Sequence, residues 1–172
     1  MFGFGKSKKA KTIDALKNQG IGGQSFLYRL FVEALEVPDE KMRKIELTYF
    51  SLSVLTYVFL RFYKGDEKEK ILDDVSLSII ESSIPHCEEV LSIDQAVTEY
   101  QQRYEKYCTL LLPLFSNTDT DPDPDILLLM HLYENVVQGS AKNAMILISL
   151  ASTLIFQYAL DNINFVKNDI KS

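Results

Sequence analysis

The chain has 172 residues, of which 47% are apolar and 24% are charged, a balance typical of one globular domain with a buried core. Disorder throughout the chain is excluded, because disordered segments lack this much leucine, isoleucine, phenylalanine and tyrosine. The net charge of −6 repels phosphate backbones, so nucleic acid is not an expected partner.

The amino-terminal segment is basic. Residues 1–17 hold five lysines and one aspartate, a net charge of +4, whereas the rest of the chain carries −10. "TIDALKNQ" predicts a short helix over residues 12–19, and "GIGG" at 20–23 predicts a stop followed by a flexible joint. We therefore expect residues 1–23 to form a basic, flexible segment and residues 24–172 to form a helical bundle domain.

Apolar residues recur at helical spacing through most of the remaining chain. The spacing predicts helices over about 25–37, 39–63, 67–84, 93–112, 124–139 and 140–161. Ser92 and Gln95 match a capping box at the start of the fourth of these. Residues 39–63 and 140–161 are apolar nearly all round, which predicts two largely buried central helices. The expected fold class is an all-α, single-domain bundle of about six helices.

A ladder of tyrosines is the most suggestive candidate for a binding surface. Tyr100, Tyr104 and Tyr107 follow one another at steps of three and four, so they share a helix face. Aromatic residues at this spacing are usually core. Tyrosine is also favoured at the rims of grooves and interfaces, where its hydroxyl reaches a polar partner. Both interpretations stay open, and the three residues are candidates for a protein contact.

Two groups of residues have partial metal-site patterns. Asp119, Asp121 and Asp123 occupy the first three ligand positions of a calcium loop, but its glycine and its bidentate glutamate are missing. His131 and Glu134 lie one helical turn apart without the further ligands that a di-iron bundle needs. The sequence therefore predicts no metal and no cofactor.

Two features bear on a membrane. Residues 143–160 form an uncharged run long enough to be a spanning candidate, although polar side chains dilute it and a buried core helix explains it as well. The basic start could hold the protein reversibly on an anionic surface. The residues concerned are Phe2, Phe4, Lys6, Lys8, Lys9 and Lys11.

No pattern assembles a catalytic site. The two cysteines form no metal-binding or disulfide pattern, and a polar stretch follows the basic start where a signal peptide would be apolar, so a cytoplasmic location is expected. The predicted function is a non-enzymatic helical scaffold that acts through a protein partner or through homo-oligomer contacts. One alternative is a peripheral protein on the inner face of a membrane. A weaker alternative is an enzyme or ligand carrier with a pocket between helices.

Overall fold

The computed structural model describes residues 7–29, 41–83, 91–111 and 157–170, and these residues are helical apart from short turns, with no strand among them. The elements are α1 (Lys8–Tyr28), α2 (Lys41–Phe62), α3 (Lys68–Ser83), α4 (Ile93–Leu111) and the π-helical η5 (Phe165–Asp169). Residues 157–164 form the helix that leads into η5. The all-α prediction is confirmed for the described part of the chain.

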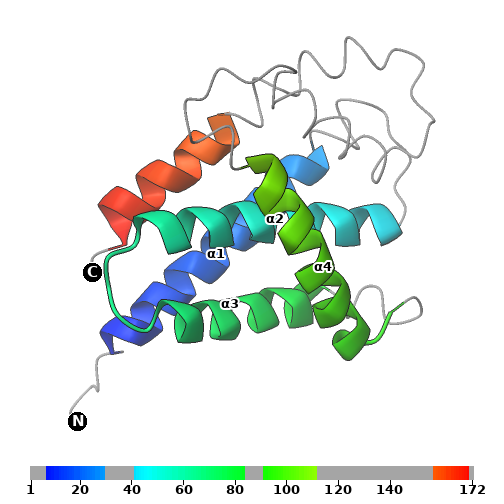
Figure 1. The fold of residues 1–172 in the computed structure, drawn as a ribbon, viewed down its shortest axis with the longest axis horizontal. Helices are drawn as coiled ribbons and strands as arrows, with labels where there is room; N and C mark the ends of the chain where they lie inside the picture. The colour runs from blue at the N-terminus through cyan, green and yellow to red at the C-terminus, as the bar shows by residue number, and fades with distance from the viewer. Residues whose placement is uncertain (1–6, 30–40, 84–90, 112–156, 171–172) are drawn as a thin grey trace.

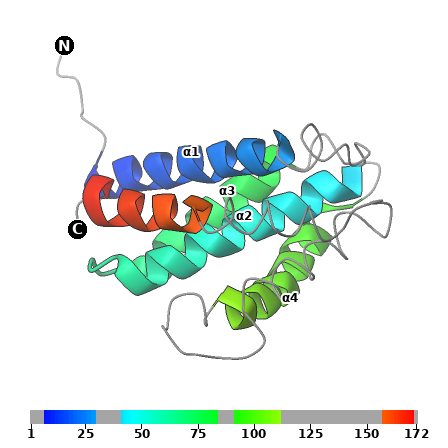
Figure 2. The ribbon, with the colours of Figure 1, turned by 90° about the horizontal axis from the view of Figure 1, so that it is seen from above.

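Helix α2 contacts each of the other described elements, and α3 also contacts α1 and α4 (Figures 1 and 2). Every residue from 45 to 56 is buried. Two of the buried hydroxyl groups of α2 donate to backbone carbonyls of their own helix: Thr48 to Lys44 at 2.8 Å and Ser53 to Tyr49 at 2.7 Å. Such bonds satisfy the hydroxyl groups, which lets polar residues occupy a core helix.

The hydrophobicity of α2 raises the question of a membrane. By length and composition, Lys44–Phe62 is the one stretch in the described ranges that qualifies as a candidate span. In the bundle, however, 78% of its apolar window is buried against other helices. A core helix passes the same test, so this finding is weak support for a span.

The predicted stop at "GIGG" is corrected by the structure. Helix α1 runs without a break through Gly20, Gly22 and Gly23. The physical reason is close packing: a Cβ atom at Gly20 would lie 2.5 Å from Ile79 Cδ1, and one at Gly23 would lie 2.8 Å from Ser51 Oγ. Two of these glycines therefore bring helices together. The described part of the amino-terminal segment is continuous with the bundle, and Leu16 lies in its core.

Helices α3 and α4 agree with their sequence patterns. The apolar stripe predicted in α3 is buried, and it comprises Ile71, Leu72, Val75, Ile79 and Ile80. The capping box is also confirmed: Gln95 N–H donates to Ser92 Oγ at 3.3 Å, and Ser92 N–H donates to Gln95 Oε1 at 3.0 Å. These bonds satisfy backbone donors that the first turn of α4 leaves open.

The carboxyl-terminal helix lies along α1 and α2. Tyr158 stacks on Phe26 with ring centroids 5.9 Å apart, and its hydroxyl bonds Ser51 Oγ at 2.8 Å. Gln19 donates to Asn162 at 3.4 Å. Of the predicted central helix 140–161, only residues 157–161 are described, and the helix predicted over 124–139 lies outside the described residues.

Candidate functional site

The predicted tyrosine ladder is divided by the structure between two environments. All three side chains belong to α4, and Tyr100 and Tyr104 line a cavity. Tyr107 is fully buried against Phe50, with ring centroids 5.1 Å apart. Tyr100 takes part in both environments, because it lines the cavity and its hydroxyl also bonds Thr56 of α2.

Tyr107 belongs to a charged cluster that joins α4 to α2. Its hydroxyl donates to Glu46 Oε1 at 2.5 Å, and Arg103 Nε donates to the other carboxylate oxygen at 2.9 Å. The Glu46 side chain is 8% exposed. Burial, with the neighbouring Glu46 carboxylate, raises the pKa of Tyr107 well above its usual value. Because every member has a partner inside the protein, this cluster holds the two helices together.

The cavity beside the ladder is an open groove of about 430 Å³ between α3 and α4, floored by α2; we refer to it as the α3–α4 groove. From α3 the lining residues are Glu69, Leu72, Asp73, Ser76, Leu77 and Ile80. From α4 they are Val97, Tyr100, Gln101 and Tyr104, and from α2 they are Thr56 and Leu60.

Apolar side chains form most of this groove. Leu77 is 45% exposed, one of the few large hydrophobic side chains in the described residues that lie so open. Tyr104 is half-buried beside it, and its ring lies 6.0 Å from that of Tyr100. An exposed leucine and a half-buried tyrosine ring in one groove provide a surface that a partner's apolar side chain can cover.

The hydroxyl groups in the wall are neutral donors and acceptors near neutral pH. Burial raises the pKa of Tyr100 to about 12, although its hydroxyl bonds Thr56 Oγ1 at 3.1 Å. Burial also raises the pKa of Tyr104 and that of the neighbouring Cys108 thiol. A protonated thiol is a poor nucleophile.

Two carboxylates give the groove its charge. Glu69 and Asp73 are exposed and lie one turn apart on α3, and no lysine or arginine of the described residues lines the cavity. These two residues and Leu77 were not predicted as site residues. Their spacing could have indicated them, since residues 69, 73 and 77 follow one another at steps of four beside the buried stripe of α3.

The other candidate residues fall in different places. Asp119, Asp121, Asp123, His131 and Glu134 lie outside the described residues, as do Phe2, Phe4 and Lys6. Lys8 and Lys11 are exposed on the first turn of α1. Lys9 makes an ion pair of 3.1 Å with Asp74 on α3, so part of its charge is compensated. Within the described ranges no three histidine, cysteine or acidic side chains are grouped as a metal site requires.

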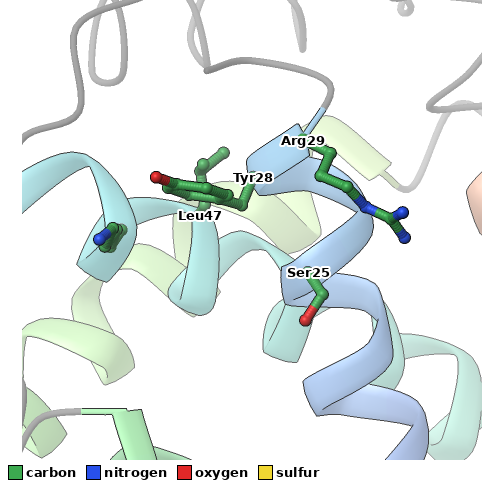
Figure 3. Close-up of a pocket in the computed structure, with 5 residues that line it drawn as sticks. Ser25, Tyr28, Arg29 and Leu47 are labelled. Carbon is green, nitrogen blue, oxygen red and sulfur yellow. The ribbon is translucent and has the colours of Figure 1, made fainter. Parts of the chain in front are cut away.

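A second open cavity, of about 470 Å³, lies between the end of α1 and the start of α2 (Figure 3). Ser25, Tyr28, Arg29, Lys44 and Leu47 line it. The Lys44 ammonium lies 5.1 Å from the centroid of the Tyr28 ring. Arg29 and Tyr28 point in different directions from the end of α1, so these polar groups do not converge on one point as a specific site requires.

We found no protein-family model, no curated protein and no solved structure that matches this chain.

Proposed function

We propose that the protein is a non-enzymatic, cytoplasmic interaction module that binds a segment of a partner protein in the α3–α4 groove. The observation that carries this proposal is the exposed Leu77 at the edge of an apolar cavity whose rim is acidic. Grooves of this kind between helices accept the apolar face of an amphipathic helix.

The charge of the rim favours a basic partner. Glu69 and Asp73 would face lysine or arginine residues that flank the apolar anchors of a bound helix, and such complementarity speeds association and selects the partner. A second copy of this chain fits less well, because each copy would present an acidic groove and a net charge of −6 to the other. The proposed occupant is therefore a basic amphipathic helix of another protein.

We further propose that the groove lies on a larger bundle of about six helices, in which residues 140–161 form a second central helix beside α2. The apolar surface of such a segment needs a core to pack on, which α2 and its neighbours provide. The groove then lies on a rigid scaffold, and a preformed site loses little entropy on binding.

A synthetic peptide tests the proposal without knowledge of the natural partner. The probe is an amphipathic helix with leucines at every third or fourth position and lysines on its other face. The control peptide carries glutamates in place of the lysines. Isothermal titration calorimetry with the full chain should detect binding of the basic peptide and much weaker binding of the acidic one.

A Leu77→Glu variant distinguishes binding in the groove from nonspecific electrostatic attraction between the peptide and the protein. The substitution adds a negative charge, which strengthens the attraction to a basic peptide, but it also removes the apolar contact. We expect affinity to fall by about tenfold, the value of one buried leucine contact. Ile93→Glu is the matched control, since Ile93 is 41% exposed and does not line the groove. Higher affinity in both variants would show electrostatic attraction alone and would refute the proposal.

The two alternatives predict other outcomes. A peripheral membrane protein would bind anionic vesicles through its exposed lysines and would bind the peptide no better than other acidic proteins do. A ligand carrier would use the same cavity, whose volume is within the range of small-molecule sites. A small molecule that stabilises the protein, together with a failure of the basic peptide to bind, would favour the ligand carrier.

A further inference from the structure

A separate pocket of about 380 Å³ lies where the carboxyl end of α2 meets η5. Three cations line it: Arg61 in the last turn of α2, Lys64 just after α2, and Lys167 in η5. Among the described residues no carboxylate lines this pocket, and Phe62 and Val166 contribute apolar surface. The pocket therefore combines a concave shape, three positive charges and an apolar wall.

Two of the cations lie against the same aromatic ring. The Lys167 ammonium lies 4.4 Å from the centroid of Phe62, and the Arg61 guanidinium carbon lies 6.0 Å from it. Cation–π contacts of this kind hold the charged groups in position. The Phe62 ring thus contacts one cation from α2 and one from η5, and all three residues line the pocket.

The ordinary role of cations at a helix end explains only part of this cluster. Positive charge is favourable near the carboxyl end of α2, and Arg61 donates to the Tyr57 hydroxyl at 3.0 Å. Lys68 already donates to the carbonyl of Leu60 at 3.1 Å. Lys64 and Lys167 are exposed, and neither forms an ion pair within the described part of the chain. Two ammonium groups from distant segments thus remain for a ligand.

We propose that this pocket binds a phosphomonoester whose organic group is apolar. A phosphate monoester carries nearly two negative charges and three acceptor oxygens, which suits a site with several cations. The apolar group would lie on Phe62 and Val166. Such a ligand could be a free organic phosphate or the headgroup of a phosphatidic acid, and the site does not depend on the α3–α4 groove.

The test uses two probes with the full chain. Phenyl phosphate represents a free monoester and is measured by isothermal titration calorimetry. Phosphatidylcholine vesicles with and without phosphatidic acid represent the lipid, measured by co-sedimentation. The Lys64→Gln/Lys167→Gln double variant changes two exposed side chains, and we expect it to weaken phenyl phosphate binding by at least about tenfold, the value of one charge-assisted contact. Lys106→Gln, an exposed lysine on α4 away from this pocket, should leave the affinity unchanged.

The outcomes are distinct. Binding of phenyl phosphate that is lost in the double variant supports the site, and vesicle binding with the same dependence on Lys64 and Lys167 identifies a lipid headgroup as a source. Failure of the wild-type chain to bind either probe overturns the proposal. Equal weakening by Lys106→Gln, or binding that survives the double substitution, overturns it as well, because the attraction would then not arise in this pocket.

Discussion

Tyr100 places its phenol hydroxyl in the wall of the α3–α4 groove, where it bonds Thr56. Burial raises its pKa to about 12 from 10.0. The pKa of this phenol is about 10 in the unfolded chain, so its contribution to stability is complete below pH 10. The contribution is lost as the pH rises toward 12, because in that window the phenol ionises in the unfolded chain but not in the folded one. Burial raises the pKa of Tyr107 and of Tyr158 in the same direction.

We therefore predict that the free energy of unfolding decreases between about pH 10 and pH 12, by about 2–3 kcal/mol from Tyr100 alone. Urea denaturation at a series of alkaline pH values measures the decrease. The Tyr100→Phe variant should be less stable near neutral pH by about 1 kcal/mol, the value of one hydrogen bond, but should lose less stability at alkaline pH. The same loss in the variant as in the wild type would show that Tyr100 is not the titrating group.

Glu46 gives a second prediction, since its carboxylate accepts from both Tyr107 and Arg103. Glu46→Ala should lower the free energy of unfolding by about 2–3 kcal/mol, because it leaves a buried hydroxyl and a partly buried guanidinium without their acceptor. Thermal denaturation followed by circular dichroism measures this. Glu105→Ala, on an exposed face of α4, is the control, and a similar loss there would mean that the Glu46 cluster adds nothing specific.

The glycines of α1 lie close together but differ in their surroundings, so we predict opposite effects of substituting them. A methyl group at Gly22 meets nothing within 4 Å, whereas one at Gly23 would meet Ser51 Oγ and the Tyr158 hydroxyl. Gly22→Ala should stabilise the protein by about 0.5–1 kcal/mol, because alanine is the better helix former. Gly23→Ala should destabilise it by about 1–3 kcal/mol through overpacking. Chemical denaturation of both variants decides, and stabilisation by both would contradict the close packing of α1.

The same glycines show why local patterns predict some elements and not others. Helix α3 was predictable with its buried stripe, because the spacing of its apolar residues carries the information. The length of α1 was not predictable, since "GIGG" taken alone indicates the end of a helix. The close packing of α1 against α2, α3 and the carboxyl-terminal helix is not visible in the local sequence. The side chains that approach Gly20 and Gly23 belong to Ser51, Ile79 and Tyr158, which are distant in the sequence.

The candidate site was predictable to a similar, partial degree. The tyrosine spacing correctly places all three residues on α4, but it does not show which of them reach the groove, because this depends on where α4 crosses α2. Leu77 reads as one more apolar residue of α3. Its exposure follows from the open space between α3 and α4, which no pattern within one helix encodes.

Across the whole molecule, the charge distribution bears on how binding responds to salt. The groove carries two exposed carboxylates and the chain a net charge of −6, so part of the attraction to a basic helix is long-range and is screened by salt. We predict that the affinity for the basic peptide falls as salt increases from low to physiological concentration. The loss caused by Leu77→Ala should persist at both, because an apolar contact is not screened. Titrations at two salt concentrations measure this, and disappearance of the Leu77 effect at high salt would contradict an apolar anchor.

Docking of a basic amphipathic helix in the α3–α4 groove is the central claim, and its most direct test is to locate the bound peptide. Two-dimensional ¹⁵N–¹H NMR spectra of the full chain, recorded as the leucine–lysine peptide is added, report which backbone amides change. We predict that the largest shifts fall on Ser76, Leu77, Gln101 and Tyr104, which line the groove on α3 and α4. Shifts concentrated instead around Tyr28 and Lys44 in the other cavity, or small changes spread over all acidic surfaces, would contradict the claim.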